Sequence, residues 1–179
     1  MQRINAEIDD KNCKITLKGI DNKAKDMSTA MKIIAKDLQS SIEYNFEVGG
    51  RYSSKDSFIG GDKKWVISKY GKGRLISRGT GGSNLSGSFV KSSTKDSATV
   101  GTNKVYARIL NFGGKTKAHD IWHRNNKALA FMRNGTKVFY GKVHHPGSNI
   151  PARPYMVVQP EDIEGFKETL LEHLTEGIK

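Results

Sequence analysis

The sequence predicts a mixed fold of helices and antiparallel strand pairs, and three observations support this. Apolar residues recur every three or four positions in residues 22–46 and again in residues 161–178, a spacing typical of amphipathic helices. Shorter runs alternate apolar and polar residues, which favours strands. Asn134-Gly135 lies between two β-prone runs, and this dipeptide is a strong signal for a tight hairpin turn.

The first 20 residues predict a β-hairpin. Two alternating runs lie within residues 3–20, and residues 9–12 supply polar turn chemistry between them. Cys13 lies on the apolar face of the second run, where a single cysteine is usually a small buried residue. It is the only cysteine, so the fold does not depend on a disulfide within the chain.

Residues 22–46 predict the longest helix and the scaffold of the fold. Its apolar stripe comprises Met27, Met31, Ile34, Leu38, Ile42 and Phe46. Asp21 is a suitable N-cap, and Gly49-Gly50 is a typical C-terminal signal. A helix of roughly 25 residues would extend about 37 Å at 1.5 Å per residue.

Residues 51–88 predict a long loop, because they contain eight glycines and eight serines with little periodicity. Long loops within a domain usually serve a function. Trp65 and Tyr70 would anchor this loop, either by packing at the edge of the core or by contacting a partner. A short strand is expected over Leu85–Lys91.

The central stretch, residues 98–114, predicts a strand pair that turns at Asn103-Lys104 and ends in a hinge at Gly113-Gly114. Its distinctive residues are Tyr106, Arg108 and the two glycines. Because the stretch lacks a nucleophile, it points to packing and contact, not to catalysis.

Residues 113–149 form a second excursion, which contains a hairpin around Asn134-Gly135. Residues 150–155, IPARPY, follow as an extended segment stiffened by two prolines. The final helix, over residues 161–178, starts with Glu161 and Asp162, which suit the positive end of a helix dipole.

The chain has 179 residues and a formal charge of +12, and its length predicts a single domain over residues 1–179. Residues 51–159 carry a net charge of +16, whereas residues 160–179 carry −4. The basic middle could contact nucleic acid or an acidic protein, or form a solvated surface. We find no signal-peptide pattern and no apolar run long enough to span a membrane, so we expect a cytoplasmic protein without membrane contact.

Motifs for catalysis, metals and cofactors are weak. His119 and His123 have the spacing of a zinc-protease helix, with Asp120 in place of the usual glutamate between them, and His144 or His145 could complete a ligand set. Hydrogen-bonded loop histidines are the more common outcome. Residues 113–116 lack the first glycine of a phosphate-binding loop. We therefore predict no enzyme activity, no metal and no cofactor.

Three motifs follow one another along the chain: TGGSNLSGSF at residues 80–89, VGTNKVYARILNFGG at residues 100–114, and IPARPY at residues 150–155. Taken in this order, they resemble the phage virion morphogenesis family, the tail completion proteins of Mu-like and related tailed phages. The resemblance covers most of the chain from Ala24 to the C-terminal helix. The motifs are each short, and their ordered combination carries the resemblance.

The resemblance implies an α+β fold in which a long N-terminal helix and a C-terminal helix pack on a small antiparallel sheet, with long glycine-rich loops. It also implies a structural role in completing or capping the tail and joining it to the head. The partners would be further copies of the chain in a ring, expected to be a hexamer, together with tail tube and connector proteins, and DNA in the channel is a further candidate. The protein would act in the host cytoplasm during assembly and end at the tail terminus or neck of the virion.

Arg153, held between Ala152 and Pro154, is a candidate for a bidentate contact with a carboxylate or for an intrachain salt bridge. The residues that we predict to form the assembly interface are Trp65, Tyr70, Tyr106, Arg108, Phe112, Gly113, Gly114, Arg153 and Tyr155. A basic nucleic-acid-binding protein is the alternative function, and a metal-dependent hydrolase is a weaker one.

Overall fold

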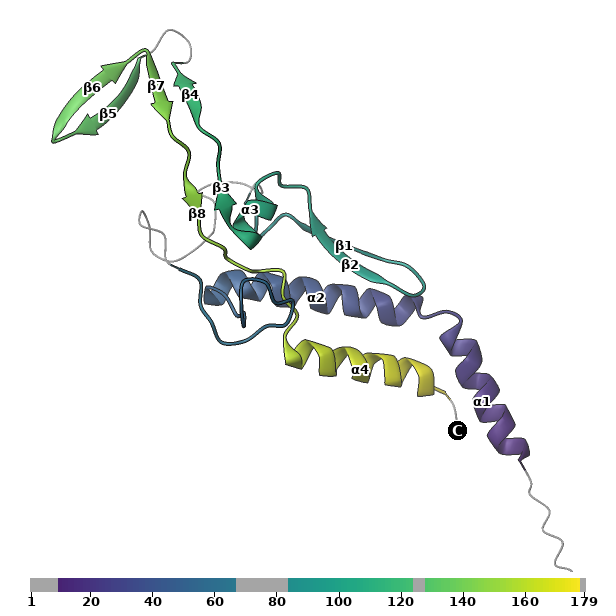
Figure 1. Cartoon of the computed structure of the whole chain (residues 1–179). Helices are drawn as coiled ribbons and strands as arrows, with labels where there is room; N and C mark the ends of the chain where they lie inside the picture. The colour runs from purple at the N-terminus through teal and green to yellow at the C-terminus, as the bar shows by residue number, and fades with distance from the viewer. Residues whose placement is uncertain (1–9, 67–83, 124–127, 178–179) are drawn as a thin grey trace, which may run out of the picture.

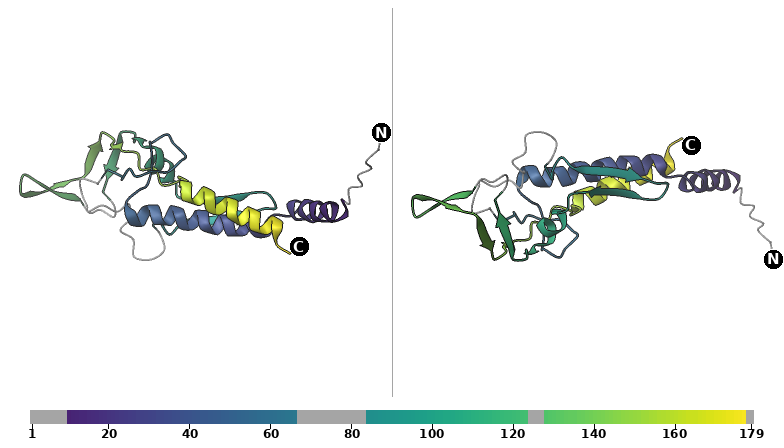
Figure 2. Two further views of the ribbon diagram at one scale, coloured as in Figure 1. Left: turned by 90° about the horizontal axis from the view of Figure 1, so that it is seen from below. Right: turned by 90° about the horizontal axis from the view of Figure 1, so that it is seen from above.

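A computed structural model describes residues 10–66, 84–123 and 128–177, and it confirms the α+β class. The helices are α1 (Lys11–Ala24), α2 (Ser28–Val48), α3 (Ala107–Phe112) and α4 (Pro160–Thr175). Helices α2 and α4 lie side by side, with the β1–β2 hairpin along α2 (Figures 1 and 2). In the described part of the chain, no helix has the length and apolar character needed to cross a membrane.

Helix α2 is the predicted scaffold, although it begins at Ser28 and not near residue 22. The Asp26 side chain accepts hydrogen bonds from the backbone nitrogen and the hydroxyl of Ser28. Asp21 lies within α1, and the N-cap of α2 is Met27, so the predicted cap at Asp21 was wrong. The predicted end is confirmed, because Gly49 is the C-cap with a left-handed φ of 79°.

Residues 11–24 form helix α1, so the predicted N-terminal hairpin was wrong over these residues; residues 1–9 lie outside the described part. Ion pairs one helical turn apart join Asp10 to Lys14 at 2.7 Å and Asp21 to Lys25 at 2.5 Å. These pairs support a helix. Cys13 is exposed and not buried as predicted.

The core forms where α2, the β1–β2 hairpin, α3 and the extended segment after residue 150 meet. Phe46 of α2 lies at its centre, with ring centroids 5.3 Å from Trp65, 5.8 Å from Phe89 and 5.1 Å from Tyr155. Aromatic rings at such distances and tilts attract one another beyond their hydrophobic burial. Leu85 packs into the same cluster with none of its surface exposed.

Strand β2 (Ala98–Thr102) is confirmed, but its partner is β1 (Phe89–Ser93) and not residues 105–112. Those residues contain α3 instead, so the predicted central strand pair was wrong. Ala107 and Asn111 are buried, and Leu110 packs against the core between them. This spacing of three and four matches one helical face, and it outweighs the alternation read from Tyr106 to Phe112.

The other strands form three further two-stranded antiparallel pairs. Strand β3 (Gly114–Lys115) pairs with β8 (Asn149–Ile150), β4 (His119–Trp122) with β7 (Lys142–His145), and β5 (Leu129–Arg133) with β6 (Thr136–Tyr140). The predicted turn is confirmed, because Asn134 and Gly135 join β5 to β6 with φ angles of 51° and 78°. The pairs β4–β7 and β5–β6 extend away from the body and together form the arm, residues 119–123 and 128–145 (Figure 1).

The C-terminal helix is confirmed as α4, with Pro160 in its first turn. Asp162 accepts a hydrogen bond from the Gln159 backbone nitrogen at 2.8 Å, and the Gln159 side chain is itself buried. The same carboxylate oxygen of Asp162 also accepts a hydrogen bond from the hydroxyl of Ser41 on α2, at 2.6 Å. The helix start is thereby fixed against α2.

Candidate interaction surface

The backbone around Tyr155 holds α3 in place through buried hydrogen bonds. The Asn111 side-chain oxygen accepts bonds from the backbone nitrogens of Tyr155 at 3.0 Å and Met156 at 3.1 Å. In return, the Tyr155 hydroxyl donates to the carbonyl of Ala107 at 2.8 Å. Because both ends of α3 are tied to one extended segment, the outer side of the helix has a fixed position.

The same segment is bound from the other side by α2 and by the loop after it. Trp65 Nε1 donates to the Pro154 carbonyl at 2.9 Å, and Asn45 Nδ2 donates to the Tyr155 carbonyl at 2.9 Å. Burial, with a smaller contribution from Tyr106, raises the pKa of Tyr155 to about 12. Tyr155 is therefore neutral at physiological pH and acts as a hydrogen-bond donor.

Gly113 turns the chain sharply from α3 into β3. Its φ is 74°, and a Cβ atom there would lie 2.7 Å from the Ala152 nitrogen and 3.0 Å from the Ile150 carbonyl oxygen. Only glycine fits such a backbone approach without a shift. Gly114, with φ of 153°, follows in the strand. Gly113 thus permits a close contact between the end of α3 and the segment at Ile150 to Ala152.

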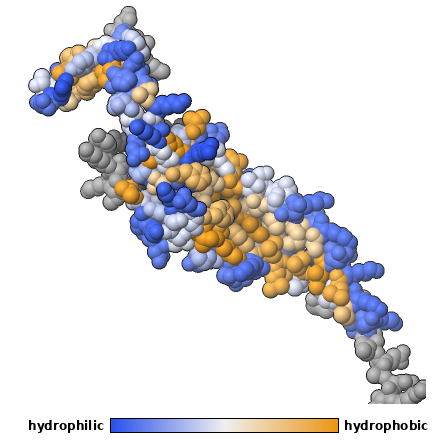
Figure 3. Space-filling view, viewed as in Figure 1, coloured by the Kyte–Doolittle hydropathy of each residue, from blue (hydrophilic) through white to orange (hydrophobic). Residues whose placement is uncertain are grey.

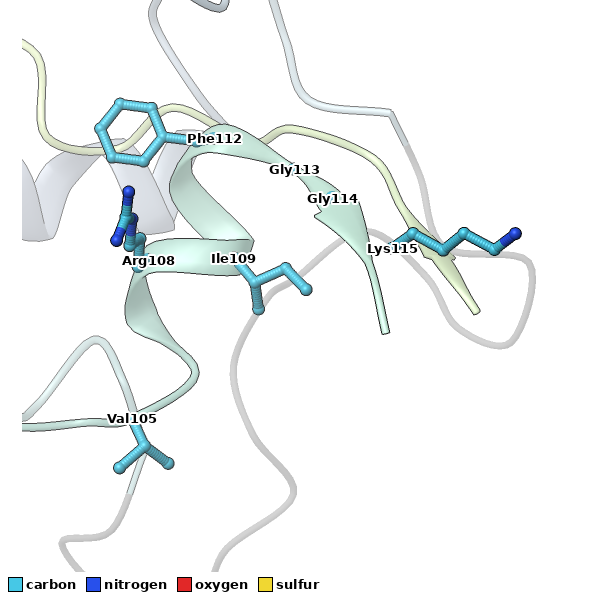
Figure 4. A pocket seen from close by; sticks show the side chains of 7 residues that line it. All are labelled: Val105, Arg108, Ile109, Phe112, Gly113, Gly114 and Lys115. Atoms are coloured by element: carbon cyan, nitrogen blue, oxygen red, sulfur yellow. The ribbon is translucent and has the colours of Figure 1, made fainter. Parts of the chain in front are cut away.

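The outer side of α3 carries an exposed apolar surface with cations at its edge, which we call the α3 patch: Phe58, Val105, Arg108, Ile109 and Phe112. Val105 is 97% exposed, Phe58 66% and Phe112 62%. Arg108 and Phe112 lie on the same side of the helix (Figure 4). Exposed apolar groups gathered in this way are typical of a contact surface.

Two hollows adjoin the α3 patch and share Arg108 and Phe112 in their walls. The first, of about 550 Å³, continues over Gly113 and Gly114 to Lys115 (Figure 4). The second, of about 510 Å³, is lined by Phe58, Met156 and their neighbours, with Asp56 as its carboxylate. Apolar walls with Arg108 and Lys115 suit a protein partner that presents apolar and acidic side chains together.

The predicted interface residues divide between surface and core. Arg108, Phe112, Gly113 and Gly114 line the first hollow, and Tyr106 packs partly buried against the core. Trp65, Arg153 and Tyr155 are buried, so in one copy of the chain they serve packing. Tyr70 lies outside the described residues.

The structure adds Phe58, Val105 and Ile109, which sequence reasoning did not single out. Val105 belongs to a run of alternating residues, and the sequence of this run does not show which of its two faces is exposed. Phe58 comes from a glycine- and serine-rich loop, and its place near α3 depends on backbone bonds between Gly60 and Val158 and between Val158 and Phe58. Only these long-range bonds bring it to the surface near Phe112.

Arg153 binds carbonyl groups in place of the predicted carboxylate. Its backbone nitrogen donates to Leu110 at 2.9 Å, and its Nε donates to Val66 at 3.3 Å. Burial lowers its pKa from the usual value. The described residues provide no carboxylate in an ion pair with it, so the predicted intrachain salt bridge is absent there.

The histidines of the HDIWH motif lie on and beside strand β4, not on a helix. Residues four apart on a strand are separated by about 13 Å at 3.3 Å per residue, too far to share a metal ion. Instead His119 stacks on His145 at 5.2 Å, and His144 Nδ1 lies 2.9 Å from Asp120. Within the described residues, no three histidine, cysteine or acidic side chains are grouped so as to hold a metal ion.

Comparison with known proteins supplies the biological context of this surface. The model of the phage virion morphogenesis family matches residues 8–175. The chain is also 28% identical over 149 residues to Mu-like prophage FluMu G protein 2 of Haemophilus influenzae, and the match covers 83% of this chain and 79% of that protein. No solved structure matches significantly.

Proposed function

Because the chain belongs to the phage virion morphogenesis family, a structural role in phage assembly follows, and we propose that this role is tail completion. Copies of the chain would form a ring, expected to be a hexamer, at the tail terminus or neck, and would promote joining of tail and head. Assembly takes place in the host cytoplasm, and the ring remains in the virion.

The exposed α3 patch is the observation that supports this proposal. A protein that acts by assembly needs a rigid contact surface, and α3 is held at both ends by buried hydrogen bonds while Phe112 and Val105 face outward. The five residues of the patch offer apolar area and one cation, Arg108, but no nucleophile with an adjacent base, so their chemistry suits binding. Tail tube and connector proteins are the partners that we propose for it.

The test is electron microscopy of particles made by the parent phage after disruption of this gene. We expect separate filled heads and tails, or tails of abnormal length, and restoration by the wild-type gene. Complementation with Phe112→Ser should fail, whereas Val90→Ser, which changes an equally exposed residue on β1, should restore normal particles. Normal infectious particles after gene disruption would refute tail completion.

Contact with DNA is a second candidate, favoured by the net charge of +16 in residues 51–159. Such binding would depend steeply on salt, because each phosphate contact releases a counterion. Titration of purified protein with random duplex DNA at 50 and 200 mM salt distinguishes the candidates. A large loss of affinity, together with absence of the protein from purified virions, would favour the DNA-binding function over the structural one.

A further inference from the structure

The arm stands apart from the core and has no layer packed on it in the described part of the chain. None of its described strand residues is buried. An isolated two-stranded hairpin is at best marginally stable in water, and each unpaired strand edge can bind another chain. The arm of one copy is therefore expected to gain stability from a partner.

The tip hairpin of the arm exposes large apolar side chains on both of its faces. Phe131 and Tyr140 stack at 5.4 Å on one face. Met132 and Phe139, 66% and 63% exposed, belong to the other, since the register places Met132 opposite Lys137 and Ala130 opposite Phe139. Figure 3 shows hydrophobic and hydrophilic residues mixed over the arm, at the upper left. This mixture is typical of protein contact surfaces.

The arm is also basic. Its described residues contain three lysines and arginines and one acidic residue, a net charge of +2. The acidic residue, Asp120, is already paired with Lys142 at 2.8 Å. Arg133 and Lys137, at the tip, form no ion pair with any described residue. Lys137 Nζ lies 5.5 Å from the centroid of the Phe139 ring, and both cations can pair with carboxylates from outside the arm.

Helix α4 offers the opposite charge on its outer face. Its residues carry five carboxylates and one lysine, a net charge of −4. Glu161, Glu164, Glu168 and Glu172 are exposed and follow one side of the helix at intervals of three and four. Leu171, 63% exposed, lies beside this row. Of the four glutamates only Glu164 has an ion-pair partner among the described residues, which is Lys167.

The arm and the acidic face lie at opposite parts of the molecule, so they cannot meet within one copy. The arm extends beyond one end of α2, whereas α4 runs along α2 toward the other end, where α1 ends and α2 begins (Figures 1 and 2). We propose that the tip hairpin of the arm binds the outer face of α4 in a second copy of the chain. Lys137 lies on the same face of the hairpin as Met132 and Phe139; it would pair with Glu168 or Glu172, while Met132 and Phe139 would cover Leu171. Arg133, next to the turn on the opposite face, would add to the positive potential of the tip.

This contact joins two different surfaces, so it is heterologous and each copy keeps one free arm and one free α4 face. Repetition closes a ring when the rotation between copies allows it. The inference rests on the proposed function, because the contact between arm and α4 would join neighbouring copies in the proposed ring. The α3 patch is a poorer match for the arm, because Arg108 and the neighbouring Lys115 carry the same positive charge as the arm.

Charge exchange between the two surfaces tests the contact by sedimentation velocity at low salt. The wild type should self-associate. One double variant, Arg133→Glu with Lys137→Glu, changes the arm, and the other, Glu168→Lys with Glu172→Lys, changes α4. Each should weaken association roughly tenfold or more, since facing like charges repel. A chain with all four changes should regain association. Lys63→Glu with Lys64→Glu, which alters exposed loop residues by the same charge, should behave as the wild type.

Disulfide trapping tests the direction of the contact in a background with Cys13→Ser. A mixture of Met132→Cys and Leu171→Cys chains should form a crosslinked heterodimer under mild oxidation, and neither variant alone should form comparable amounts of homodimer. Met132→Cys mixed with Lys36→Cys, an exposed position on α2, should remain uncrosslinked. Circular dichroism confirms that each variant is folded.

Several results would overturn the inference. The wild type could be monomeric at all concentrations, or the chain with all four charge changes could fail to regain association. The Met132→Cys and Leu171→Cys mixture could also crosslink no more than the mixture with Lys36→Cys. Loss of duplex DNA binding in the Arg133 and Lys137 variant, with self-association unchanged, would assign the arm to nucleic acid instead. If gene disruption causes assembly defects but a gene that encodes one of the double charge variants restores normal particles, tail completion is supported and only this contact is rejected.

Discussion

Replacement of Asn111 by alanine should destabilise the fold strongly, because this side chain supports two backbone groups. Asn111 is 6% exposed, and its oxygen accepts hydrogen bonds from the backbone nitrogens of Tyr155 and Met156 at 3.0 and 3.1 Å. An unpaired buried donor costs about 1–3 kcal/mol, so the loss of both bonds should cost about 2–5 kcal/mol. A domain of this size is stable by only about 5–15 kcal/mol in total.

Urea denaturation followed by circular dichroism measures this loss. With a slope near 2 kcal/mol per molar, the midpoint should fall by about 1–2.5 M. Asn103→Ala is the matched control, because Asn103 is exposed and its side chain has no hydrogen bond to a described residue, and it should change stability by less than about 0.5 kcal/mol. Equal midpoints for the two variants would refute the role assigned to Asn111.

Three further predictions concern the same region. Gly113→Ala should lower the unfolding free energy by about 1–3 kcal/mol from its positive φ alone, and by more because of the contact with Ala152. Gly101→Ala, with open space around it, should cost little in the same urea experiment. Similar losses in the two variants would contradict this prediction. Phe112→Ser should leave the urea midpoint within about 0.5 kcal/mol of the wild type, since its ring is 62% exposed, and a large shift would show that the ring serves the fold. The pKa of Tyr155 is raised from 10.0 to about 12, so the unfolded chain loses this proton first; stability is unaffected below pH 10 and should fall between pH 10 and 12. This decline should be smaller in Tyr155→Phe when unfolding is measured across that range, and an identical decline would contradict the assignment.

Local patterns in the sequence were sufficient for the elements that depend on neighbouring residues. The stripe from Met31 to Phe46 predicted most of α2, and Gly49 predicted its end, because a left-handed C-cap favours glycine whatever surrounds it. Asn134-Gly135 predicted the tip hairpin for the same reason. The resemblance to the family rested on ordered motifs and needed no coordinates.

Two elements were wrong because their sequences fit two periods. The alternation of Cys13, Ile15 and Leu17 resembles a strand, but α1 forms with ion pairs one turn apart. The run from Tyr106 to Phe112 alternates as well, yet Asn111 is buried through bonds to residues more than 40 positions away. Short apolar runs do not distinguish helix from strand by themselves.

The sequence by itself determined the family, the helical scaffold with its left-handed end, the tip turn and the uneven distribution of charge. Only the tertiary structure decided which of the predicted interface residues are exposed. Trp65, Arg153 and Tyr155 are buried because the extended segment after residue 150 crosses the core, while Phe58 and Phe112 remain outside it. Burial depends on contacts between residues far apart in the chain, and a residue's type and immediate neighbours do not encode those contacts.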